Sequence, residues 1–277
     1  MNDNIKELLA AGAAIAEPIQ SHGGIPYIAL PEGYALHDIE RLLNNPTRKR
    51  AEVKTTDVAS FISYVSLHKV SSESSAIYAK VDADSGKFGL VAVIDDHKML
   101  PLVSQDAGWR EHRCTFSSNP SVEWTRWMNA NKKQVTQTDF ATFLEDNLPD
   151  IAALEGMPTG ADILAMALGF EANAEKRLRS KINLQSGGVR FEFVDDEDKD
   201  TRTRMDVFQR FTIGIPVFDG SNSAYPIEAR LKYREKDGKV TFWYELIRPD
   251  RVFRSAVNEE MARIKAETEL HVFVGTP

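Results

Sequence analysis

The chain has 277 residues, which is long enough for one large domain or two ordinary ones. Its 34 Lys and Arg residues against 41 Asp and Glu give a net charge of −7, which excludes a generally basic polyanion-binding protein but leaves room for a local basic patch. No apolar run approaches the ~20 residues that span a bilayer, and residues 1–5 lack the features of a secretory signal. The single cysteine, Cys114, excludes an internal disulfide and a cysteine-based zinc cluster. We therefore expect a cytoplasmic protein with no membrane contact and no cofactor.

The first half of the chain predicts helices together with a small buried sheet. An Ala- and Leu-rich helix is expected over residues 4–16, and a better amphipathic helix over 56–68 with Thr56 as its N-cap. The segment 88–95 is nearly all apolar, which predicts a strand buried on both faces. The other elements predicted in this half are strands at 25–30, 76–82 and 109–116, a short helix at 36–43, and helices at 120–129 and 136–147.

The second half predicts an antiparallel sheet packed by two long helices. A Pro- and Gly-punctuated stretch at 149–158 is the expected boundary between an N-terminal α+β region, 1–150, and a C-terminal region, 158–277, although the two could pack as one unit. The first long helix is expected over 159–180, where its cationic C-terminal end would offset the helix dipole. The sheet is expected over 188–247, the second long helix over 249–270 and a last strand over 271–274. The fold class is therefore α+β.

One hairpin of the predicted sheet can be placed in register. Asp237 and Gly238 form a two-residue turn signal of type I′, so Lys236 should face Lys239. This register pairs Leu231 with Tyr244 on one face and leaves the charged side chains on the other. On the apolar face it also pairs Tyr233 with Phe242 and Ala229 with Leu246, and on the polar face Arg230 with Glu245, Lys232 with Trp243 and Arg234 with Thr241.

Polar side chains gather at the end of the buried strand and around the strand that follows it. Asp95, Asp96 and His97 lie at the end of the first strand, and Asp106 and His112 lie a loop away, around the second. Two imidazoles and a carboxylate are a usable ligand set for zinc or another divalent ion, and could also supply a general base. No HxH or HExxH spacing fixes the geometry, so turn chemistry is the competing interpretation.

The charged face of the hairpin is a second candidate site. Arg230, Lys232 and Arg234 alternate along one strand with Trp243 opposite them, and Arg210 and Arg190 could join them. Cationic side chains interleaved with an aromatic ring suit phosphates and a stacked base. The competing interpretation is structural, because Arg230 could pair with Glu245 and Lys232 with Trp243 across the strands.

Cys114 is a third candidate. In a strand, His112 and Cys114 point to the same face, and the cationic neighbours Arg110 and Arg113 could lower the pKa of the thiol. A Cys–His nucleophile is therefore conceivable, but no third, orienting group can be assigned. The competing interpretation is a buried structural thiol.

Six segments together resemble the YfdQ-like proteins of tailed phages and prophages, and the resemblance runs along most of the chain. The segments are PTR at 46–48, IDDH at 94–97, VEWTRW at 122–127, QTDFATFLEDN at 137–147, GIPVFDG at 214–220 and EARLKYR at 228–234. The resemblance implies a phage-encoded protein of an early or accessory kind that acts inside the host cell. It supplies no activity, cofactor or catalytic residue.

Four functional hypotheses follow. The first is a non-enzymatic phage accessory protein that assembles into a homo-oligomer in the host cytoplasm, with a host or phage protein as a further partner. The second is a nucleic-acid-binding module in phage recombination or replication. The third is a metal-assisted hydrolase built on the Asp95, His97 and His112 cluster. The fourth, a counter-defence protein, fits the setting but rests on no particular residue.

Overall fold

The computed structural model of the chain falls into two compact units, Met1–Lys49 and Arg50–Pro277. In the first unit, β1 (Ile19–Gln20) pairs antiparallel with β2 (Pro26–Tyr27), and η1 (Glu40–Leu42) is a short 3-10 helix. Only residues 5–7 and 12 of the expected helix over 4–16 are described, and they are helical. The structure describes residues 5–7, 12, 19–20, 26–27, 40–83, 85–98, 107–169, 177–182, 189–194, 204–221, 223–236 and 239–277.

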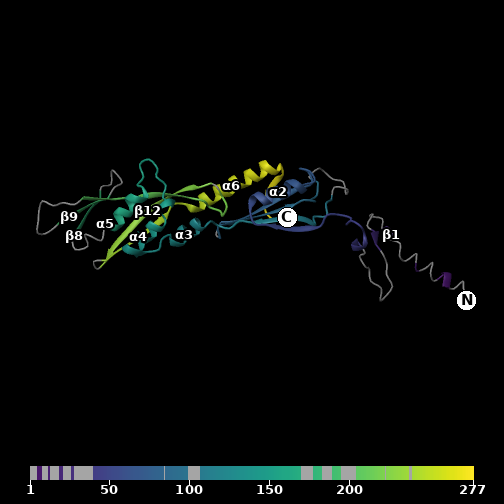
Figure 1. Ribbon diagram of the computed structural model, residues 1–277, viewed down its shortest axis with the longest axis horizontal. Helices are drawn as coiled ribbons and strands as arrows, with labels where there is room; N and C mark the ends of the chain where they lie inside the picture. Colours follow the sequence, from purple (N-terminus) through teal and green to yellow (C-terminus); the bar gives the residue numbers. More distant parts are fainter. Residues whose placement is uncertain are drawn as a thin grey trace. The chain divides into compact units, whose positions relative to one another are not determined.

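A five-stranded mixed sheet forms one part of the second unit (Figure 1). Its two outer strands run parallel to their neighbours, and its three central strands are antiparallel to one another. One of those outer strands comes from the end of the chain, so the sheet joins segments that are far apart in sequence. In spatial order the strands are β14 (His271–Val274), β4 (Ala76–Asp82), β5 (Lys87–Val93), β6 (His112–Ser117) and β3 (Ala51–Thr55).

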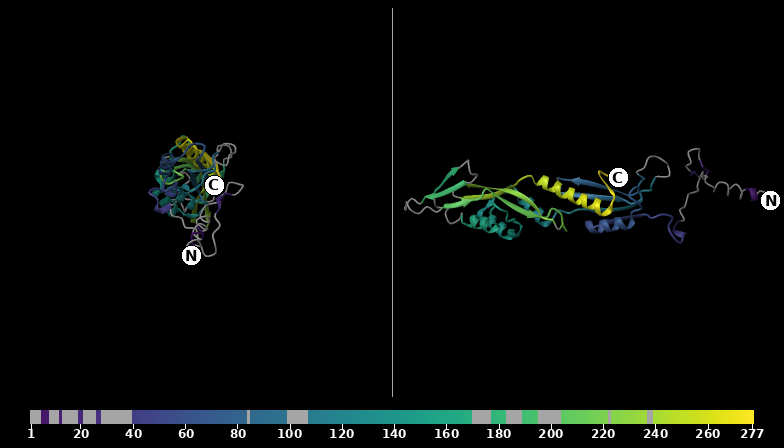
Figure 2. Two further views of the ribbon diagram at one scale, coloured as in Figure 1. Left: turned by 90° about the vertical axis from the view of Figure 1, so that its right-hand side faces the viewer. Right: turned by 90° about the horizontal axis from the view of Figure 1, so that it is seen from above.

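Two helices, α2 (Val58–His68) and α6 (Pro249–Thr268), pack against each other over one face of this sheet (Figure 2, right). The N-cap of α2 is Asp57, whose carboxylate accepts the backbone N–H of Ser60 at 2.7 Å, rather than the expected Thr56. Along most of β5 the burial alternates, and only at its end are both faces enclosed, with Ala92 and Val93 fully buried. Phe88 and Leu90 are enclosed under the helices, whereas Gly89 and Val91 on the opposite face are half-buried.

A four-stranded antiparallel sheet forms another part of the same unit. It follows the order β11 (Arg210–Ile215), β12 (Tyr225–Lys236), β13 (Lys239–Leu246) and β7 (Val135–Thr136). The predicted hairpin register is confirmed pair by pair from Ala229↔Leu246 to Lys236↔Lys239, while the turn residues 237 and 238 lie outside the described residues. Its helical neighbours are α3 (Val122–Ala130), α4 (Gln137–Asp146), η3 (Leu148–Asp150) and α5 (Gly160–Gly169).

The expected long helix over 159–180 is wrong beyond residue 169. Helix α5 ends at Gly169, and residues 177–182 form a strand instead. Cationic and other residues alternate with period two in this segment, which suits a strand rather than a helix, so the cationic cluster does not offset a helix dipole. The strands β8 (Arg177–Ile182), β9 (Val189–Val194) and β10 (Arg204–Val207) form an antiparallel sheet in the order β10-β9-β8.

The stretch 149–158 does not coincide with the division between the two compact units. Ile151 forms a β-bridge with Ile213, and the N–H of Ala152 donates to the carbonyl of Thr212 at 2.9 Å. The α+β class holds, but β14 from the C-terminal end pairs with β4, so the two sequence halves share one sheet. The expected regions 1–150 and 158–277 are therefore interleaved in space.

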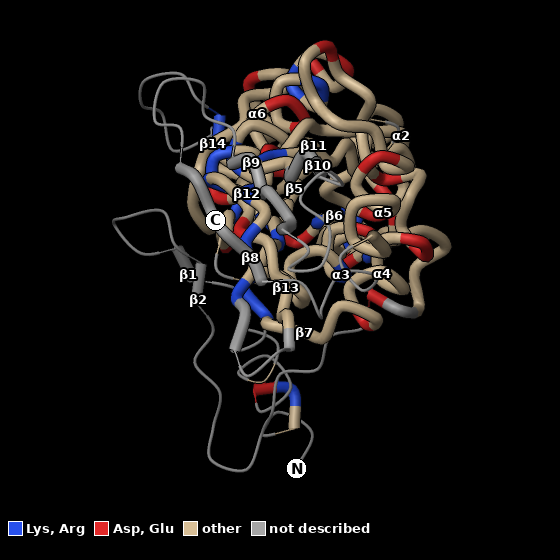
Figure 3. Tube along the Cα trace, turned by 90° about the vertical axis from the view of Figure 1, so that its left-hand side faces the viewer, with Lys and Arg blue, Asp and Glu red and all other residues tan. Residues whose placement is uncertain are grey.

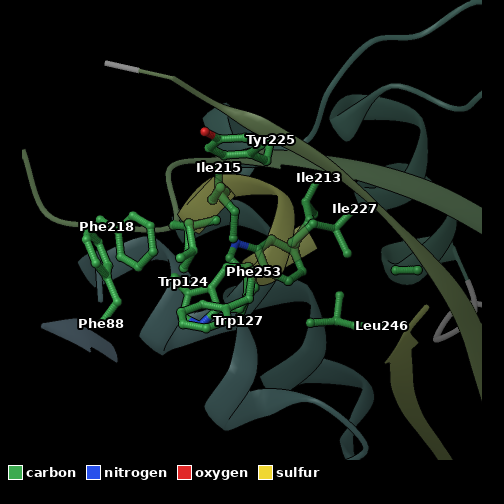
Figure 4. Packing of buried hydrophobic residues seen from close by; sticks show 14 of the residues in the cluster. Phe88, Trp124, Trp127, Ile213, Ile215, Phe218, Tyr225, Ile227, Leu246 and Phe253 are labelled. Carbon is green, nitrogen blue, oxygen red and sulfur yellow. The ribbon is translucent and has the colours of Figure 1, made fainter. Parts of the chain in front are cut away.

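Trp127 is fully buried in a cluster of aromatic and aliphatic side chains (Figure 4). Its ring centroid lies 5.0 Å from that of Phe143 and 5.1 Å from that of Tyr244. The core continues toward the five-stranded sheet through Phe218, whose ring lies 4.8 Å from that of Phe88. Shared aromatic packing, rather than the strands alone, thus joins the two sheets.

Replacing Tyr244 by Phe should destabilise the fold by about 1 kcal/mol, because the carbonyl of Trp127 loses one of its two donors in a buried site and keeps only the backbone N–H of Asn131 at 3.1 Å. The hydroxyl of Tyr244 donates to that carbonyl at 2.6 Å. Unfolding in urea measures the loss. A matched control is Tyr225→Phe, whose hydroxyl donates to the exposed Glu259 at 2.7 Å, where water can replace it. Equal losses in the two variants would contradict this account.

Candidate functional site

The polar residues at the end of β5 form hydrogen bonds with residues 107–111, which we call the loop before β6. The two carboxylate oxygens of Asp95 accept the backbone N–H groups of Glu111 at 3.1 Å and His112 at 3.0 Å. The carbonyl of Asp95 also accepts the N–H of Arg110 at 3.2 Å. Asp95 is therefore engaged by the backbone that leads into β6, and Asp106, the other carboxylate expected here, lies outside the described residues.

A hydrogen bond to His97 and a close backbone approach at Gly108 also hold the loop before β6 against the end of β5. The Nδ1 atom of His97 accepts the N–H of Gly108 at 3.0 Å. A Cβ atom at position 108 would lie 2.1 Å from the carbonyl oxygen of Asp95 and 2.4 Å from that of Asp96. Only glycine fits this approach, so the loop is fixed by close packing as well as by hydrogen bonds.

The imidazole of His112 faces the helices rather than the loop. The residue is 3% exposed, and its Nε2 lies 2.8 Å from the hydroxyl of Tyr64 on α2. The ring of His68 lies 5.4 Å from that of His112. In the part of the chain that the structure describes, no three His, Cys, Asp or Glu side chains are grouped as metal ligands would be. Asp95, His97 and His112 thus have structural partners, and the metal site stays a prediction.

Cys114 is buried on the helix-facing side of β6. Burial raises the pKa of its thiol to about 11, which is opposite to the lowering that a nucleophile needs. The neighbouring cation does not compensate, because Arg113 lies on the other face of the strand and its Nε donates to the carbonyl of Arg110 at 2.8 Å. The geometry favours a structural thiol.

Asp96, the third polar residue at the end of β5, forms a buried charge cluster with Tyr78 and Arg110 that the sequence did not predict. The carboxylate of Asp96, 5% exposed, accepts the hydroxyl of Tyr78 at 2.9 Å and lies 3.0 Å from Nε of Arg110. Burial and the adjacent Asp96 raise the pKa of Tyr78. Arg110 has a left-handed backbone with φ of 59°, which a non-glycine residue rarely adopts. The sequence predicts that residue 110 lies in a strand over 109–116, so no sequence signal indicates its left-handed conformation.

The basic face comprises Arg210, Arg230, Lys232, Arg234 and Trp243 on the outer side of β11, β12 and β13. The four cations are exposed and Trp243 is half-buried. Arg210 pairs in register with Arg230, and Lys232 with Trp243. Figure 3 shows basic segments near β12 and β13, on the side away from α4 and α5. The structure thus brings together the five predicted residues, whereas Arg190 lies in the separate strand β9.

The structural partners expected for these cations are not the ones observed. The Nη1 of Arg210 pairs with Glu228 at 2.8 Å, and the guanidinium of Arg234 lies 5.9 Å from the centroid of the Trp243 ring. Among the described residues, no ion pair joins Arg230 to Glu245, and Lys232 has neither an ion pair nor an aromatic contact. The charges of Arg230 and Lys232 are therefore not used within the described fold.

The comparisons place the chain in a family. One family model matches residues 2–277. The chain belongs to the family described as an uncharacterized conserved protein, DUF2303. No curated protein and no solved structure matches it. The expected relation to a family of unknown function is thus supported, and the function has to be argued from geometry. Within the described segments, every helix is too short or too polar to cross a bilayer.

Replacing Gly108 by Ala should destabilise the fold by about 1–3 kcal/mol, because the added methyl group would overlap two backbone carbonyl oxygens. Thermal unfolding measures the loss. The matched control is Gly89→Ala on β5, where the added Cβ would meet the carbonyl oxygen of Phe116 at an ordinary 3.6 Å. An unchanged midpoint for Gly108→Ala would show that the loop is not pressed against β5 as described.

Proposed function

We propose that the protein is a non-enzymatic, phage- or prophage-encoded accessory protein of the host cytoplasm that binds single-stranded nucleic acid through the basic face. The observation that carries the proposal is the row Arg230, Lys232 and Arg234. These side chains are exposed, and the cross-strand contacts that would have given Arg230 and Lys232 a structural use are not formed. Exposed cations without internal partners are available to phosphates.

The spacing of the row suits an extended phosphate backbone. Alternate residues of a strand lie ~6.7 Å apart on the same face, so the three cations extend over ~13 Å. On the same face, Arg210 adds a fourth cation, which is neutralised by Glu228. Glu245 lies opposite Arg230 without pairing with it. The face keeps a local positive charge although the whole chain carries −7.

Trp243 gives the basic face an aromatic surface for a base. It opposes Lys232 in the ladder, and the guanidinium of Arg234 lies over its ring, 5.9 Å from the centroid. Stacking on an aromatic ring needs an unpaired base, whereas a duplex presents mainly phosphates. This combination favours a single strand over a duplex as the ligand.

The remaining candidate residues support a binding role over a catalytic one. Asp95 and His97 hold the loop before β6, and His112 and Cys114 are buried. The metal-assisted hydrolase therefore stays the weaker prediction. Its expected ligand Asp106 lies outside the described residues. The counter-defence role also stays a prediction, because it names no residue.

Self-assembly is a second candidate function, favoured by the edge strand β14. Phe273 is 42% exposed and Val274 is 74% exposed, and β14 is the last strand in the order of its sheet. An exposed apolar edge can pair with the same edge of a second copy, which would form a two-fold homo-oligomer. Such assembly is compatible with nucleic-acid binding.

Replacing Arg230, Lys232 and Arg234 together by Gln should weaken binding to a labelled oligothymidylate and reduce its salt dependence. Each lost phosphate contact on a single strand lowers the slope of log K against log[salt] by about 0.7, so the slope should fall by about 2. Fluorescence anisotropy across a salt series measures both quantities. Trp243→Leu should weaken binding while leaving the slope unchanged, because stacking releases no counterions.

The matched control for the triple variant removes three exposed cations from α6, with Arg251, Arg254 and Lys265 replaced by Gln. This control changes the net charge equally but leaves the basic face intact. An unchanged slope in the triple variant, or an equal loss in the control, would contradict the proposal.

Light scattering on a sizing column, with absorbance at two wavelengths, tests self-assembly. We expect an integer multiple of 31.0 kDa without excess absorbance from nucleic acid. Val274→Lys should shift the mass to that of the monomer, because a charge on an edge strand opposes pairing. Val70→Lys, at a residue 69% exposed outside the strands, is the control and should leave the mass unchanged. A monomeric wild-type protein would rule out this candidate.

A further inference from the structure

We propose that a hollow on the open face of the five-stranded sheet binds a phosphate group through Arg50, Arg110 and Arg113. The hollow has a volume of about 630 Å³, which lies in the range of small-molecule sites. Its lining comes from β3, β5, β6 and the loop before β6. The site is separate from the basic face and does not depend on the proposed function.

The helices leave this face of the sheet open. Phe116 and His112 on β6 face α2, because the ring of Phe116 lies 6.5 Å from that of Phe61 and His112 contacts Tyr64. Because side chains alternate along a strand, Arg113 and Thr115 lie on the opposite side of the sheet. Arg113 therefore lies on the face that α2 and α6 leave uncovered, where the hollow lies.

Each of the three arginines is held through its Nε atom. Nε of Arg113 donates to the carbonyl of Arg110 at 2.8 Å, and Nε of Arg50 donates to Glu111 at 3.1 Å. Nε of Arg110 lies 3.0 Å from Asp96. For Arg113, no contact of the terminal Nη groups is formed with another described residue. These groups form the planar fork that binds phosphate oxygens.

Arg113 is the arginine of the lining whose charge no described carboxylate neutralises, because Arg50 pairs with Glu111 and Arg110 pairs with Asp96. Glu52 and Glu111 also line the hollow, but Glu111 is neutralised by Arg50. Arg113 is anchored by a neutral carbonyl, so its charge has no paired carboxylate among the described residues. Nε of Arg110 is enclosed and already lies 3.0 Å from the carboxylate of Asp96, so a ligand would meet this residue through its terminal nitrogens.

Contacts of the loop before β6 fix the backbone conformation of Arg110. Its left-handed backbone, with φ of 59°, is costly for a non-glycine residue and persists only where the surroundings fix it. Asp95, His97 and the close approach of Gly108 supply that constraint. A strained arginine fixed before the ligand arrives reduces the ordering cost of binding.

Calorimetric titration of the full chain with inorganic phosphate and pyrophosphate tests the site. We expect saturable binding to the wild type. Arg113→Gln should weaken it about tenfold or more, because charge-assisted hydrogen bonds are lost. Arg113→Lys keeps the charge but not the fork, so its affinity should lie between the two. The control, Lys54→Gln, removes an exposed cation from β3 outside the lining and should leave the affinity unchanged.

The triple variant of the basic face separates this site from the proposed function, because it should still bind phosphate. In that variant, stronger binding of an oligothymidylate with a 5′-phosphate than of one without it would identify a strand end as the source of the phosphate. Equal binding would identify a small phosphate ligand. The proposal is overturned by absence of saturable binding up to about 10 mM, the range of weak ligands, or by equal affinities in wild type and Arg113→Gln with unchanged thermal midpoints.

Discussion

The register of β12 and β13 fixes both the core and the basic face. Leu231 lies opposite Tyr244, and Tyr233 lies opposite Phe242, whose ring stacks on Phe140 of α4 at 5.4 Å. Because side chains alternate along a strand, a slip by one residue would turn the cations inward and expose the aromatic rings. Burying unpaired cations is costly, so the packing of Tyr244 and Phe242 also holds the basic row at the surface.

The loop before β6 is a second constraint, and it explains the structural role of Asp95, Asp96 and His97. Carboxylates and imidazoles close together in sequence suggest catalysis. Here Asp95 and His97 accept backbone N–H groups, and Asp96 pairs with Arg110. Their chemistry is used to hold an irregular segment against the end of a strand.

Local patterns in the sequence predict much of this fold. The hairpin register followed from one turn signal and two alternating faces, and α2 and α4 followed from the helical spacing of apolar residues, although the N-cap of α2 is Asp57 and not Thr56. Four residues of the basic face were predicted on the same grounds, whereas Arg210 and Arg190 were named together as possible additions and only Arg210 lies in this sheet. Such patterns predict well where the apolar face and the polar face of an element indicate the same register or the same helical spacing.

Long-range pairing and local strain escaped prediction. The parallel pairing of β14 with β4 joins residues almost two hundred positions apart, and no local pattern encodes it. The strand β8 was predicted as the end of a helix, because a cationic run suits both interpretations until a partner strand is known. The left-handed Arg110 and the enclosed Asp96 depend on contacts from separate elements.

The central claim is that nucleic acid meets the basic face at Trp243. Photocrosslinking with an oligothymidylate that carries 5-iodouracil tests it most directly, because this base crosslinks to aromatic rings that stack on it. Mass spectrometry then identifies the attached peptide. The account predicts that Trp243 on β13 carries the crosslink and that Trp243→Leu abolishes it. A crosslink at Trp109, which is 67% exposed outside the basic face, with none at Trp243, would contradict it.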